Sequence, residues 1–117
     1  MNTTSNAWES FLSAAQLLSS RGPIKQRLTA AYTTYLANVD VEDIPRECRE
    51  EFVSIGSRLS VVVPLRGETA VQASIRKMSD FEAAAQALRI VNLMGTMMRM
   101  QLQPRQPVLR AVNSGDD

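Results

Sequence analysis

The residues from Asp80 to about Leu102 constrain the fold of this chain more than any other segment. Ser79 and Glu82 have the spacing of a capping box, in which the serine hydroxyl and the glutamate carboxylate each accept a backbone amide proton at the start of a helix. The apolar residues that follow recur at helical spacing, and no proline interrupts them before Pro104. The sequence therefore predicts one long helix over this segment.

The apolar surface of this predicted helix widens toward its C-terminal end. Its first half carries one ordinary stripe, made of Phe81, Ala84, Ala85, Leu88 and Val91. From Ile90 onward there are two neighbouring rows, Ile90, Leu93, Met97 and Met100 in one and Val91, Met94 and Met98 in the other. A helix that is apolar over most of its circumference is buried on several sides. This segment must therefore be covered by more than one neighbour.

Two ways of covering the helix remain open. In the first, the helix is the central post of a bundle, and its flexible methionine side chains fill irregular gaps. In the second, one row faces the core and the other faces a partner, because methionine also suits adaptable binding surfaces. The second predicts an interface of Leu93, Met94, Met97, Met98 and Met100, with Arg99 at its rim. A helix lying on a membrane is a poorer fit, since Arg99 is the only base in this half.

Helical spacing and breaker residues predict four further helices ahead of this one. They cover about residues 7–20, 23–38, 45–60 and 68–78, and Gly56 inside the third indicates a close helix crossing. Between the third and fourth, three valines precede Pro64 and favour extended backbone. We expect this connector, residues 60–65, to pack its valines on the core.

These elements predict an all-α fold. A chain of 117 residues fits one domain, and 44% hydrophobic and 21% charged residues are ordinary for a globular protein. We expect a compact bundle of about five helices over residues 1–103, with a short extended connector. Residues 104–117 are expected to form a mobile tail.

The residue types present argue against most catalytic chemistry. The chain has no histidine, which is the commonest general base and metal ligand. Its one cysteine, Cys48, lies at an apolar helical position without an imidazole to activate it. Asp40, Glu42 and Asp43 lack the spacing of a calcium loop, and no glycine-rich phosphate loop occurs. We expect no enzymatic activity, no cofactor and no metal. An enzyme that uses an acid pair around Asp43 and Glu47 would be supported only by the clustering of these acids.

Nucleic-acid binding is the main alternative to protein binding. Residues 71–90 have the length of a helix–turn–helix, but its second helix would present Asp80, Phe81 and Glu82 to the DNA, and acids repel phosphate. Contacts to the nucleic-acid backbone remain open for the bases of the C-terminal part. These residues are Arg76, Lys77, Arg89, Arg99 and Arg105.

Charge and targeting signals complete the prediction. Acids gather in residues 40–51 and bases in residues 76–110, which indicates either two solvated faces or complementary docking within a dimer. The single cysteine and the lack of a leader or membrane-spanning segment favour the cytoplasm. The sequence thus predicts a non-catalytic cytoplasmic interaction or regulatory protein that forms a homodimer through its Met-rich last helix. The alternative is a nucleic-acid-associated regulator.

Overall fold

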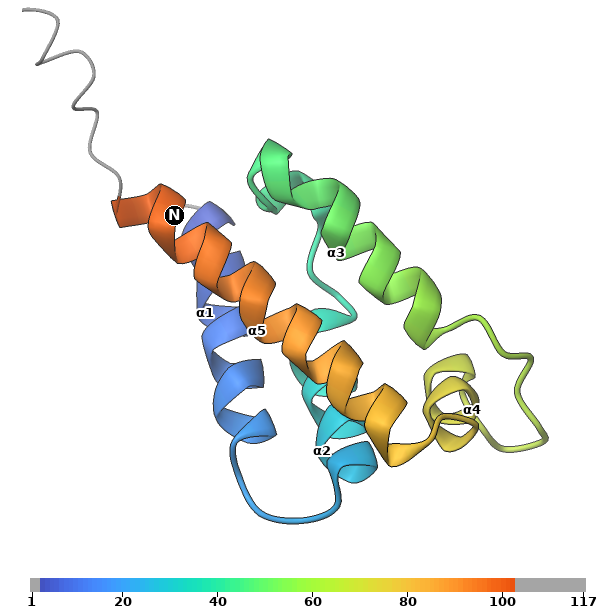
Figure 1. The fold of residues 1–117 in the computed structure, drawn as a ribbon. Helices are drawn as coiled ribbons and strands as arrows, with labels where there is room; N and C mark the ends of the chain where they lie inside the picture. Colours follow the sequence, from blue (N-terminus) through green and yellow to red (C-terminus); the bar gives the residue numbers. More distant parts are fainter. Residues whose placement is uncertain (1–2, 103–117) are drawn as a thin grey trace, which may run out of the picture.

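We describe residues 3–102 from a computed structural model of the chain, with the side chains of residues 7–100. Over this range the chain is entirely helical apart from its loops (Figure 1). The elements in chain order are α1 (Thr3–Leu18), α2 (Ile24–Ala31), the π-helical turn η1 (Tyr32–Leu36), the 3-10 turn η2 (Val41–Asp43), α3 (Arg46–Leu59), α4 (Ala70–Arg76) and α5 (Asp80–Leu102). The prediction of an all-α bundle of about five helices is confirmed. The tail predicted for residues 104–117 lies outside the described residues.

The long helix α5 organises the bundle. It packs against α1, α2 and α3, while the short α4 fills the end of the molecule between α2 and α3 (Figure 1). One side of α5 is therefore covered by three helices. The other side faces outward, and α5 is not surrounded as a central post would be.

The core is built from residues at helical spacing. On α3 the apolar residues at helical spacing form one buried face: Cys48, Phe52, Ile55 and Leu59. The ring of Phe52 meets the ring of Phe11 from α1, with centroids 5.8 Å apart and planes tilted by 54°. This tilted aromatic contact joins the N-terminal part of the bundle to α3.

The second helix differs from its prediction at its C-terminal end. The spacing of a regular α-helix places both Tyr35 and Leu36 on the apolar face, but η1 is wound as a π-helix, and the Ala37 amide donates to the Tyr32 carbonyl at 2.8 Å. Because this hydrogen bond spans five residues instead of four, the turn changes which side chains share a face. Leu36 is consequently buried with Ala31, five positions earlier, and Tyr35 is exposed.

Local start and stop signals act largely as expected. Gly22 has φ +109°, a conformation that favours glycine, but it lies in the loop before α2, four residues after α1 ends at Leu18. The capping box of α5 is present, with the Ser79 amide 2.8 Å from Glu82 Oε1 and the Glu82 amide 3.0 Å from Ser79 Oγ. A second capping box, between Thr69 and Gln72 of α4, was not anticipated. The helix predicted from residue 7 begins earlier, at residue 3.

The connector between α3 and α4 corrects one expectation. Residues 60–65 form no strand, and Val61 and Val63 are exposed rather than packed on the core. The next element, α4, packs against α2 and α3 and contributes the buried Ile75 to the core. The connector is held instead by its backbone, because the amide of Val62 donates to the buried hydroxyl of Ser74 at 2.9 Å.

Candidate functional site

The outward side of α5 carries large apolar side chains in solvent. The exposed fractions are 83% for Phe81, 58% for Leu88, and 36% each for Val91 and Met98. Ala84, which is exposed, and Gly95, which is half-buried, lie between them at the same alternating spacing of three and four residues. We call these six residues, Phe81, Ala84, Leu88, Val91, Gly95 and Met98, the outer stripe. This spacing is the heptad pattern by which two helices pack along their length.

A second apolar face of α5 points into the molecule. It consists of Ala83, Ala87, Ile90, Leu93 and Met97, all of them buried. The residues nearest its N-terminal end are alanines, which let neighbouring helices approach closely. The α5 helix is therefore apolar on two sides, and the bundle covers only one of them.

The predicted interface residues divide between these two sides. Leu93 and Met97 lie in the core of the monomer, with 5% and 3% of their surfaces exposed. The half-buried Met100 approaches the buried thiol of Cys48, with a Sδ–Sγ distance of 3.8 Å. Met94 is also half-buried and packs against the core. Leu93 and Met97 thus belong to the core of the monomer, although α5 is covered on one side only.

Of the predicted interface set, Met98 and Arg99 are exposed. Nothing in the monomer tests whether they contact a partner, so that part stays a prediction. Sequence reasoning placed the interface on the methionine rows and treated the stripe through Phe81 and Leu88 as ordinary. The missed signal was the spacing, since this stripe continues without a break from residue 81 to residue 98.

Charged groups occupy the first and last turns of α5. Asp80 and Glu82 lie in its first turn and Arg99 in its last. The guanidinium of Arg99 donates to Thr96 Oγ1 at 3.1 Å and lies over Gly95, where it would be 3.8 Å from an added Cβ. An acidic end and a basic end therefore flank the apolar stripe.

Two of the predicted nucleic-acid contacts are engaged with carboxylates. Arg76 binds Glu68 in two contacts of 2.6 and 3.1 Å, and this holds the pKa of that carboxyl below its usual range. Arg89 binds both oxygens of Glu51, at 2.9 and 3.0 Å, and lowers the pKa of Glu51 in the same way. Because each of these two arginines is already paired with a carboxylate, it would attract a phosphate less strongly.

The remaining predicted nucleic-acid contacts do not form one patch on the described surface. Lys77 and Arg99 are exposed, but Lys77 lies at the C-terminal end of α4, ahead of α5, whereas Arg99 lies in the last turn of α5. Arg105 lies outside the described residues. Nucleic-acid binding stays a prediction without added support.

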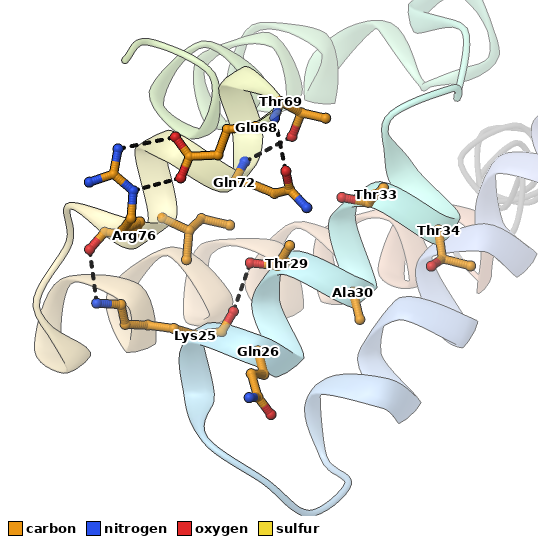
Figure 2. A pocket seen from close by; sticks show the side chains of 11 residues that line it. Lys25, Gln26, Thr29, Ala30, Thr33, Thr34, Glu68, Thr69, Gln72 and Arg76 are labelled. Carbon is orange, nitrogen blue, oxygen red and sulfur yellow. Dashed lines mark hydrogen bonds and ion pairs between the residues drawn. The ribbon is translucent and has the colours of Figure 1, made fainter. Parts of the chain in front are cut away.

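An open groove of about 650 Å³ lies between α2 and α4 (Figure 2). Two of the polar side chains in it bind backbone carbonyls, since the Lys25 ammonium donates to the Arg76 carbonyl at 3.1 Å and the Thr29 hydroxyl donates to the Lys25 carbonyl at 2.8 Å. Thr69 and Gln72 are joined by the capping box of α4. The bond from Lys25 to the Arg76 carbonyl joins α2 to α4, and the two charged groups of opposite sign in the groove, Glu68 and Arg76, are paired with each other.

The buried thiol of Cys48 is the other reactive side chain to consider among the described residues. Burial, with a smaller effect of the nearby Glu47 charge, raises the pKa of the Cys48 thiol and so disfavours its reactive thiolate. Within residues 3–102 no group of three or more acids and cysteines is placed to hold a metal ion. Among the described helices, none is both long and apolar enough to span a bilayer.

Comparisons with known proteins point to no functional site in this chain. No protein-family model matches the chain, and no curated protein or solved structure matches it. The exposed side of α5 is therefore the strongest candidate site, on its geometry alone.

Proposed function

We propose that this protein is a small, non-catalytic interaction or regulatory protein of the cytoplasm that associates with another copy of itself through α5. The observation that carries the proposal is the outer stripe, which leaves Phe81, Leu88 and Met98 in water along one side of a single helix. Contiguous apolar patches of this kind mark interaction surfaces on soluble proteins. The single cysteine supports the cytoplasmic setting.

The driving force for association is the burial of these side chains. Fully burying one large aliphatic or aromatic side chain contributes about 1.5–3 kcal/mol. Association in turn costs about 4–15 kcal/mol in lost translational and rotational freedom. Several members of the outer stripe must therefore be covered together, as the heptad spacing allows.

The test is molar mass by light scattering over a dilution series, comparing the unaltered chain with Leu88→Glu. We expect the unaltered chain to form dimers at the concentrated end and Leu88→Glu to remain monomeric there. Since Leu88 is exposed, its variant should keep the helical circular dichroism and melting temperature of the parent monomer.

Two further variants separate the surface from the core. Val53→Glu makes the same change at an exposed position of α3, at 53% exposure, and should leave the dimer intact. Met97→Glu buries a charge in the core and should unfold the chain. A monomeric parent at every concentration, or a dimer unaffected by Leu88→Glu, would contradict the proposal.

A further inference from the structure

We infer that the two copies pack α5 against α5 in antiparallel orientation, about a two-fold axis beside residues 89 and 90. This inference rests on the proposed self-association and adds its geometry. It follows from the order of residues in the outer stripe and from the charges at the two ends of the helix.

The outer stripe fits against a second copy of itself that runs in the opposite direction. When the two helices are antiparallel, Phe81 faces Met98 of the other copy, Ala84 faces Gly95, and Leu88 faces Val91. All of these pairs belong to one register, because the two residue numbers in each pair add to the same value. The two smallest residues therefore meet each other, which permits close approach of the helix backbones. The aromatic ring meets a thioether, a favourable contact worth about 0.3–1.5 kcal/mol.

A parallel pair would be packed less evenly. Each residue would then meet its own copy, so two Phe81 rings would share one layer while two Gly95 residues left a gap in another. Gaps and crowded layers both lower stability, since protein interfaces pack as closely as interiors. The alternation of large and small residues in the stripe thus favours the antiparallel pair.

The charges also favour antiparallel packing. In this orientation the acidic first turn of α5, with Asp80 and Glu82, lies at the level of Arg99 in the other copy. A parallel pair would set acid beside acid and Arg99 beside Arg99. The helix dipoles add to the preference, because the positive N-terminal end then lies near a negative C-terminal end. Arg89, near the axis, is already neutralised by Glu51 of its own chain.

The size of the contact predicts a weak dimer. Residues 81–98 span roughly 26 Å at the rise of an α-helix. One helix of this length covers less than the approximately 800 Å² that each partner gives to a standard stable interface. We therefore expect the dimer to dissociate on dilution, with a dissociation constant on the order of micromolar.

The experiment is disulfide trapping in a Cys48→Ala background, with cysteines introduced at Ala84 and Gly95. Both sites accept a side chain, because Ala84 is exposed and a Cβ at Gly95 would have Arg99 Nη1 as its nearest neighbour at 3.8 Å. Antiparallel packing puts residue 84 opposite residue 95 of the other copy. The double variant Ala84→Cys/Gly95→Cys should therefore form a covalent dimer under mild oxidation, as seen on a non-reducing gel.

The two single variants are the matched controls. In the antiparallel dimer, the two copies of residue 84 lie eleven residues of helix apart, roughly 16 Å, which exceeds the reach of a disulfide, and the same holds for residue 95. Neither single variant should cross-link. Cross-linking of both single variants would show a parallel pair and overturn the inference while self-association stands.

The remaining outcomes are also informative. If the Cys48→Ala parent is a dimer by light scattering and the double variant does not cross-link, the copies meet through another surface and the inference is wrong. If the parent is a monomer at all concentrations, the proposed self-association fails together with the inference.

Discussion

Gly56 is the position where one added methyl group would come too close to a neighbouring side chain. A Cβ built there would lie 2.9 Å from the hydroxyl oxygen of Tyr32, which is closer than real contacts allow. The glycine was expected to mark a helix crossing, and it instead accommodates the side chain of Tyr32 from η1. Burial raises the pKa of Tyr32, as expected for a phenol removed from water in this contact.

Two helical glycines make a matched pair for substitution. Gly56→Ala should lower the free energy of unfolding by about 1–3 kcal/mol through crowding. Adding Tyr32→Phe should restore most of that loss, because it removes the crowding oxygen. Gly95→Ala has room for its methyl and should raise the free energy of unfolding by up to about 1 kcal/mol.

The measurement is urea unfolding at concentrations where the chain is monomeric, so that contacts between copies do not contribute. Equal effects of the two alanine substitutions would contradict the steric explanation.

At the scale of the helix, the two capping boxes fix where α4 and α5 begin. Each box satisfies two backbone amides that no turn of the helix can reach. Only the one at Ser79 and Glu82 had been expected, because Gln72 of the other is less conspicuous in a sequence than a glutamate. Both boxes join residues that are only three positions apart in the sequence, so they can form without contacts from other helices.

The capping contribution can be measured on α5. Ser79→Ala removes the hydroxyl that accepts from Glu82 and should lower the free energy of unfolding by about 1 kcal/mol. Ser57→Ala makes the same change at an exposed position within α3 and should leave stability nearly unchanged or slightly raised. A thermal melt of both variants gives the comparison, and an equal shift for the two would exclude a specific role of the cap.

At the scale of the whole molecule, the fold brings part of the acidic stretch onto the basic one. Glu51 belongs to the acids of residues 40–51, and it pairs with Arg89 of the C-terminal bases at 2.9 Å. The same guanidinium donates to Ser54 on α3 at 2.8 Å. Some of the acids and bases that are separated along the sequence therefore pair within one chain, and this pairing joins α3 to α5.

This ion pair predicts a pH dependence. The lowered pKa of Glu51 means that its stabilising effect is present above roughly pH 4.3, the ordinary value for a glutamate, and is lost as pH falls through the lower pKa of the folded state. Since the Glu51 side chain is 44% exposed, screening keeps the effect below about 1 kcal/mol.

Glu51→Gln should accordingly be less stable than the parent near neutral pH and lose less stability between about pH 5 and pH 3. Glu50→Gln, at an exposed position of the same helix, is the control and should follow the parent curve. Chemical unfolding at each pH supplies the data. A parent and a Glu51→Gln variant with parallel curves would show that the pair contributes nothing.

The sequence by itself determined the number of helices and most of their ends. Proline, glycine and capping residues act on their nearest neighbours, and the 3.6-residue period of α3 and α5 can be seen without knowing what covers them. The π-helical turn was missed because its extra residue is held by the packing of Leu36 rather than by a local signal. The exposure of Val61 and Val63 was missed because burial depends on which distant elements pack together, and here α4 rather than the connector packs against α2 and α3.

Only the tertiary structure decided which apolar side of α5 is covered. By hydrophobicity alone, Phe81 and Leu88 have the stronger claim to the core than Ala83 and Ala87, yet the alanines are inside. The reason is distance, because α1 and α2 pack against α5, and close approach of helices needs small side chains between them. The large residues are left on the outer stripe, so burial in the monomer accounts for Leu93 and Met97 and leaves Phe81 and Leu88 exposed.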